Sequence, residues 1–187
     1  MPSANPEPQP LALDRIAAKV TVRPIFLRRV ARPTPWKQAL LTGEIANVTG
    51  YLIEEGGKVS LWQVQNDLDL RRVAIAVNES RESFTGKIEF LPILPDELTA
   101  VGATCEQTRG ETECAAAAQL HYDATIDGEK GHRIIAQLVG TGRELARCTR
   151  GQMALAYQES LEDGCFAVSD STTCRCGEEP TRTAEHP

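Results

Sequence analysis

The chain has 187 residues, of which 41% are hydrophobic and 25% are charged, and its formal net charge is −6. This length and composition are typical of one globular domain with a core of its own. The acidic balance argues against a protein that binds nucleic acid over its whole surface. No apolar run approaches the roughly 18 residues of a membrane span, and the proline-rich start has no secretory signal pattern. We therefore expect a cytoplasmic protein.

Charge and proline content divide the chain into three parts. Residues 1–10 contain four prolines and are predicted to form a disordered leader. A single globular domain is expected at 11–169, followed by a polar, cysteine-containing tail at 170–187. Residues 1–43 carry seven basic and two acidic side chains, so the rest of the chain is strongly acidic. A basic N-terminal arm of this kind can dock on a partner, or it can fold back on its own acidic domain.

The first half of the chain alternates between helical and strand patterns. Residues 11–20 place apolar side chains on one helical face, and 19–30 alternate like a strand that Pro24 would confine to a sheet edge. A short helix is predicted at 34–43, with Pro35 in its first turn and Gly43 at its end. The strands expected next are 44–53, 58–65, 71–78 and 87–91, the first two being joined by a turn at Gly56-Gly57.

After a polar loop at 99–113, the stretch from Cys114 to Gln158 has the pattern strand, turn, strand, turn, strand. Its first strand places His121 and Asp123 on one face, because side chains alternate along a strand. The last segment, 143–161, has two interpretations. It is a strand with a bulge at Gly151, or it is one long helix.

The number of short strands and tight turns predicts a mainly β fold. We expect an antiparallel meander that closes as a barrel or sandwich and carries one or two short helices. The alternative is an α+β fold with a long helix at 143–161.

One set of candidate residues suggests catalysis. His121 and Asp123 form a histidine–carboxylate pair that can orient an imidazole as a general base, and Cys148 is the candidate nucleophile. Such a set would suit an acyl-group hydrolase or transferase. The same polar face is also what the solvated side of an antiparallel strand normally carries. No serine-hydrolase elbow, P-loop, HExxH zinc motif or dinucleotide fingerprint occurs in the sequence.

The six cysteines leave three interpretations open. A reducing compartment would keep them as free thiols, whereas an oxidising one would favour disulfides, including a bond between Cys105 and Cys114. The third interpretation is a zinc site built from Cys165, Cys174 and Cys176 with a fourth ligand.

Aromatic and basic side chains supply the ligand-binding candidates. Inside a barrel, Trp36, Tyr51 and Trp62 would line a cavity, although in a sandwich they would only fill the core. Arg143 and Arg147 share a face in either interpretation of their segment and could hold an anionic group. The leading hypothesis is a non-enzymatic binding module that holds a small apolar ligand or a protein partner, with no sequence-specific nucleic acid. The alternatives are the acyl-transfer enzyme and a zinc-stabilised interaction module.

Overall fold

The computed structural model of the chain describes residues 9–16, 23–53, 57–79, 87–112 and 114–164. Most of the leader at 1–10 and all of the tail at 170–187 lie outside these ranges. The elements, in chain order, are α1 (Leu13–Ile16), β1 (Ile25–Arg29), α2 (Pro33–Thr42), α3 (Ala46–Leu52), β2 (Lys58–Val64), α4 (Asp67–Glu79), β3 (Ile88–Ile93), α5 (Pro95–Ala100), β4 (Thr104–Gln107), α6 (Ala115–Ala118), β5 (His121–Thr125), α7 (Gly128–Gly140), β6 (Ala146–Cys148) and α8 (Arg150–Glu162).

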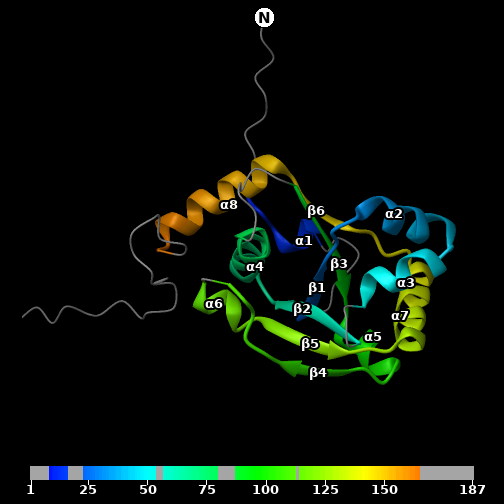
Figure 1. The fold of residues 1–187 in the computed structure, drawn as a ribbon. Helices are drawn as coiled ribbons and strands as arrows, with labels where there is room; N and C mark the ends of the chain where they lie inside the picture. Colours follow the sequence, from blue (N-terminus) through cyan, green and yellow to red (C-terminus); the bar gives the residue numbers. More distant parts are fainter. Residues whose placement is uncertain (1–8, 17–22, 54–56, 80–86, 113, 165–187) are drawn as a thin grey trace, which may run out of the picture.

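A six-stranded sheet in the order β4-β5-β2-β1-β3-β6 forms the centre of the molecule (Figure 1). Every pair of neighbouring strands is antiparallel, and Phe26 of β1 stands opposite Gln63 of β2 on one side and Ile93 of β3 on the other. The predicted antiparallel sheet is confirmed. The predicted barrel or sandwich is wrong, because β4 and β6 remain open edges, and the fold is mixed α/β instead of mainly β.

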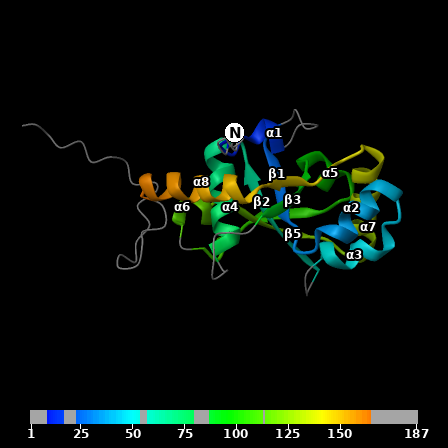
Figure 2. The same ribbon diagram turned by 90° about the horizontal axis from the view of Figure 1, so that it is seen from above.

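Helices cover both faces of the sheet (Figures 1 and 2). We call α1, α4, α6 and α8 the α4 layer, and α2, α3, α5 and α7 the α7 layer. The α4 layer packs on sheet residues that include Ile25, Leu27, Trp62, Val64, Ile88 and Phe90. The α7 layer packs on residues that include Phe26, Val59, Leu61, Leu91, Ile93 and Ala124. Two hydrophobic cores therefore lie back to back on one sheet.

Strand β3 shows most clearly that the sheet is covered twice. All six of its residues are buried. Phe90 belongs to the core under the α4 layer, and Leu91 to the core under the α7 layer. Adjacent side chains on a strand point to opposite faces, so both faces of β3 are shielded from solvent. Pro92 lies inside this strand, which runs to Ile93 and so extends two residues beyond the predicted end at residue 91.

Three segments predicted as strands are helices: 44–53 contains α3, 71–78 belongs to α4, and the middle of the Cys114–Gln158 stretch is α7. In α4, Leu70, Val73, Ala74 and Val77 are all buried, which is the i, i+3, i+4, i+7 spacing of a helix face. Its Ile75 and Ala76 are buried as well, so no polar stripe runs along the helix over this stretch. In such a sequence the two-residue repeat of a strand and the 3.6-residue repeat of a helix fit equally well.

The segment 143–161 contains both structures that its sequence allows. Residues 146–148 form edge strand β6, and α8 begins directly afterwards. Thr149 accepts a hydrogen bond from the N–H of Gln152, and the Gln152 side chain accepts one from the N–H of Thr149. This reciprocal capping box starts the helix, so Gly151 lies in its first turn and marks no bulge.

Two further predictions about strands are corrected. β1 lies inside the sheet, because it pairs on both sides, and Pro24 precedes it without removing a ladder donor. The loop predicted at 99–113 contains edge strand β4. Among the helices that the structure describes, none is long and apolar enough to cross a membrane.

Candidate functional site

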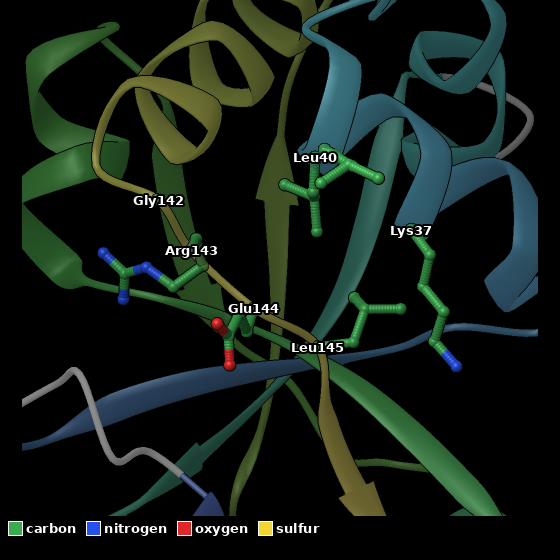
Figure 3. A pocket seen from close by; sticks show the side chains of 7 residues that line it. Lys37, Leu40, Gly142, Arg143, Glu144 and Leu145 are labelled. Atoms are coloured by element: carbon green, nitrogen blue, oxygen red, sulfur yellow. The ribbon is translucent and has the colours of Figure 1, made fainter.

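A groove of about 460 Å³ separates α2 from the segment that leads into β6 (Figure 3). Its lining residues are Lys37, Leu40, Leu41, Gly142, Arg143, Glu144 and Leu145. Leu145 points into the space between the two segments, whereas the Arg143 guanidinium extends away from Leu40 and Lys37. We call this feature the α2 groove. Three of its seven lining residues are leucines, three are charged and one is glycine.

Helix α2 forms one wall of the α2 groove and matches the helix predicted at 34–43. Gly43 ends it in the left-handed region, at φ 79°, and donates its N–H to the Ala39 carbonyl. Trp36 and Ala39 are buried against the sheet, which turns Leu41 outward. Leu41 is 87% exposed and is the most exposed large apolar side chain among the described residues.

A buried ion pair fixes the other wall. Arg143 donates from Nη2 to Oε1 of Glu97 at 2.6 Å, and the two side chains are only 6% and 11% exposed. Glu97 also accepts the N–H of Leu94 at 2.7 Å, which caps α5. The backbone N–H of Arg143 donates to the Leu138 carbonyl at the end of α7. The segment 142–145 is thus tied to two helices of the α7 layer.

A second ion pair borders the α2 groove. Lys37 donates to Oε1 of Glu89 at 2.7 Å, and the Glu89 side chain is 2% exposed. Oε2 of the same carboxylate is buried without a hydrogen-bond partner. Arg147 stands opposite Glu89 across the β3–β6 pair and is exposed. The sequence predicts two ligand-binding arginines. Arg143 is one of the residues that line the groove, but its guanidinium extends away from Leu40 and Lys37. Arg147 is not one of the lining residues.

The three aromatic candidates are not brought together. Trp36 is buried in the core under the α7 layer, and Trp62 lies in the core under the α4 layer. Tyr51 is 45% exposed on α3, where the Arg32 guanidinium lies 5.8 Å from its ring centre. Trp36 and Trp62 act as core residues on opposite faces of the sheet, so no aromatic cavity of the kind expected in a barrel is formed.

His121 lies at the centre of a hydrogen-bonded group at the other end of the sheet. Its Nε2 is 2.6 Å from Oγ of Ser60, and its Nδ1 is 2.7 Å from Oγ1 of Thr108. Asp123 lies on the same strand face, with Oδ1 4.0 Å from Nε2. The ring meets Trp62 edge-to-face at 4.9 Å. Sequence reasoning paired His121 with Asp123 but missed Ser60 and Thr108. The one available signal was a serine between Val59 and Leu61 in β2.

Cys148 is not part of that group. It lies on β6 at one edge of the sheet, while His121 lies on β5, and strands β2, β1 and β3 separate them. Four strand spacings correspond to roughly 19 Å, far beyond the reach of proton transfer. Burial also raises the pKa of the Cys148 thiol to about 12. The structure thus places Cys148 in the core, out of reach of His121.

These surroundings predict the order in which the described thiols react. Cys105 is exposed, and the partial burial of its sulfur raises its pKa, whereas Cys148 is buried. At pH 8 we expect iodoacetamide to alkylate Cys105 at least about tenfold faster than Cys148, because the thiolate is the reacting form and must be reached by the reagent. Peptide mapping by mass spectrometry after timed quenching measures both rates, and preferential alkylation of Cys148 would contradict its assignment to the core.

The zinc candidates Cys165, Cys174 and Cys176 lie outside the described residues. Within the described ranges, no three His, Cys, Asp or Glu side chains gather as a metal site would require. Cys105 and Cys148 are free thiols there, so the bond considered between Cys105 and Cys114 is not formed. Comparisons of the chain with protein-family models, with curated proteins and with solved structures gave no match. Any functional assignment therefore rests on the residues described above.

Proposed function

We propose that the α2 groove is a non-catalytic binding site that holds a segment of a protein partner. The observation that carries the proposal is the position of Leu41, which is 87% exposed in the wall of a groove that Leu40 and Leu145 also line. Removing one leucine side chain from water stabilises by roughly 2 kcal/mol. Binding of a partner that covers Leu41 is favoured by this free energy, and the protein need not change its fold to bind.

The openness of the groove favours a polypeptide over a small apolar ligand. Small-molecule sites bury 70–90% or more of the ligand. Here one wall is a single helix whose outermost leucine is almost fully in water. Such a wall is better covered by a surface that extends beyond the groove, as a bound peptide or helix does.

The charges at the groove do not select an occupant of one sign. Lys37 and Glu144 have opposite signs, and Lys37 is already paired with Glu89. No single sign of charge dominates, so electrostatics select neither an acidic nor a basic segment. We expect the occupant to insert one aliphatic side chain between Leu41 and Leu145 and to make polar contacts at the margin.

Leu41→Asp tests this proposal directly. A random peptide library displayed on phage is selected on the wild-type protein, and the affinity of the enriched peptides is measured by isothermal titration calorimetry. We expect Leu41→Asp to weaken binding about tenfold or more, because a central interface side chain is worth about 1–2 kcal/mol. The matched control is Leu68→Asp on α4, an exposed leucine in the other helix layer (39% exposed), which should leave the affinity unchanged.

Several outcomes would contradict the proposal. One is that the selection enriches no peptide family; another is that Leu41→Asp and Leu68→Asp weaken binding equally. A third is saturable, Leu41-dependent binding of an apolar dye such as anilinonaphthalene sulfonate with no peptide bound, which would indicate a small-ligand site. Concentration-dependent dimers that Leu41→Asp abolishes, seen by sedimentation velocity, would identify a second copy of the chain as the occupant.

A further inference from the structure

We propose a second site, independent of the α2 groove, in which Ser60 is a nucleophile activated by His121 and takes an acyl group from a small ester. The observation behind it is a chain of two short hydrogen bonds through one imidazole, from Ser60 to Nε2 and from Nδ1 to Thr108. The site lies on the sheet face that the α4 layer covers, towards the β4 edge. The α2 groove lies in the other layer.

The two hydroxyl partners are compatible with the tautomer that this chemistry needs. A neutral imidazole donates from one nitrogen and accepts at the other. With the proton on Nδ1, the ring donates to Oγ1 of Thr108, and Nε2 accepts the hydroxyl proton of Ser60 at 2.6 Å. Thr108 is held in place because its backbone N–H donates to the His121 carbonyl at 3.1 Å. Thr108 is accordingly a positioning residue.

Packing restricts the imidazole to this orientation. Trp62 contacts the ring edge-to-face. Gly110 closes over both residues: a Cβ at this position would lie 2.7 Å from Cη2 of Trp62 and 3.1 Å from Cβ of His121. The His121 side chain is 12% exposed, so the ring is mostly enclosed but still accessible. A base held at hydrogen-bond distance from a hydroxyl is the arrangement that activates a serine.

The charged neighbours stabilise the protonated ring. Asp123 stands opposite Ser60 in the β2–β5 pair, with Oδ1 4.0 Å from Nε2. Lys58 approaches its other oxygen at 3.6 Å, and Glu106 of β4 stands opposite Asp123. The Asp123 carboxylate, 4.0 Å from Nε2, attracts the ring when it carries a positive charge. The imidazolium that forms when Ser60 loses its proton is therefore favoured.

The reaction balances with water as the only co-reactant. As Oγ of Ser60 forms a bond to the ester carbonyl carbon, its proton passes to Nε2 of His121. The bond to the leaving oxygen breaks, and the imidazolium returns the proton to it, which releases an alcohol and leaves an acyl-serine. Water then attacks the acyl carbon while Nε2 of His121 takes its proton. The bond from that carbon to Oγ breaks, and the imidazolium returns the proton to Oγ, which releases the acid and restores Ser60 and the neutral imidazole.

A fluorophosphonate probe tests the nucleophile without knowledge of the ester. Oγ of Ser60 displaces fluoride from phosphorus, and intact-protein mass spectrometry with peptide mapping locates the adduct. We expect one adduct, at Ser60, on the folded protein and none on the same protein in urea. Ser60→Ala should abolish it, and His121→Gln should slow it about 100-fold or more, since a general base contributes at least that factor. Ser160→Ala, which removes a buried hydroxyl on α8, is the matched control and should change nothing.

The pH profile separates a catalytic group from a structural one. Labelling requires the neutral ring, so its rate falls on acidification. Asp123→Asn removes a charge that favours the imidazolium, and the pH of half-maximal labelling should move to a lower value. Thr108→Val should lower the plateau rate. Circular dichroism identifies any variant that fails to fold. If a variant is unfolded, the test is the labelling of Ser60 in the folded wild type against that in the wild type unfolded by urea. The proposal is overturned if the folded wild type acquires no adduct at Ser60, or if labelling is equally fast in His121→Gln.

Discussion

Replacing Arg143 with methionine is expected to lower the free energy of unfolding by about 3 kcal/mol or more. The substitution leaves the Glu97 carboxylate, which is 11% exposed, without its counter-charge. Breaking a buried ion pair by removing one partner is strongly destabilising, whereas replacing the whole pair is not. Urea unfolding followed by far-ultraviolet circular dichroism measures the change. The same variant should also loosen the segment 142–145 and weaken peptide binding in the α2 groove.

Two comparison variants make this prediction specific. The double variant Arg143→Met with Glu97→Gln should recover part of the loss, because the buried charge is gone and glutamine can still accept the Leu94 N–H. Lys130→Met breaks the ion pair between Lys130 and Asp127, whose charged atoms are 3.9 Å apart and whose aspartate is 63% exposed. This variant should change the free energy of unfolding by no more than about 0.5 kcal/mol. An Arg143→Met variant as stable as Lys130→Met would contradict the role given to the buried pair.

Phe90→Ala and Leu91→Ala are each expected to destabilise the protein by about 3 kcal/mol. Both side chains are fully buried, one under the α4 layer and the other under the α7 layer. Truncating a buried phenylalanine or leucine to alanine leaves a cavity as well as removing apolar contact. Unfolding in urea, monitored by tryptophan fluorescence and circular dichroism, measures both changes.

This pair of neighbours distinguishes a sheet covered on two faces from a sheet with one wet face. In the barrel or sandwich predicted from sequence, one of two adjacent strand residues would face solvent, and its truncation would cost little. Thr104→Ala on the edge strand β4 is the control, because Thr104 is exposed and should change stability by less than about 0.5 kcal/mol. If either Phe90→Ala or Leu91→Ala falls within the range of the control, one helix layer does not cover the sheet as described.

The sequence indicated several elements correctly because their signals are local. The proline and glycine at the ends of α2, and the strands β1, β2, β3 and β5, follow from short-range patterns. Helix α4 was mistaken for a strand for a physical reason. Residues such as Val73 and Ile75 are β-branched, and α4 is buried around much of its circumference, so no polar stripe marks the helical period. A helix packed between a sheet and other helices loses the pattern that would identify it.

The two sites depend on contacts that sequence spacing does not encode. Arg143 and Glu97 are 46 residues apart, and Ser60 and His121 are 61 residues apart. The alternation of β5 correctly placed His121 and Asp123 on one face, but the order β4-β5-β2 decides which hydroxyls reach the ring. The exposure of Leu41 likewise follows from the way Trp36 and Ala39 turn α2 onto the sheet.

Methyl nuclear magnetic resonance of the peptide-bound protein tests the α2 groove most directly. With leucine methyl groups labelled, we expect intermolecular Overhauser effects from the bound peptide to Leu40, Leu41 and Leu145, and shifts of the same resonances on titration. The methyl resonances of Leu68, exposed in the other helix layer, should stay in place. Overhauser effects to Leu68 or to the surroundings of Tyr51, with none to Leu41, would contradict the assignment of the groove as the binding site.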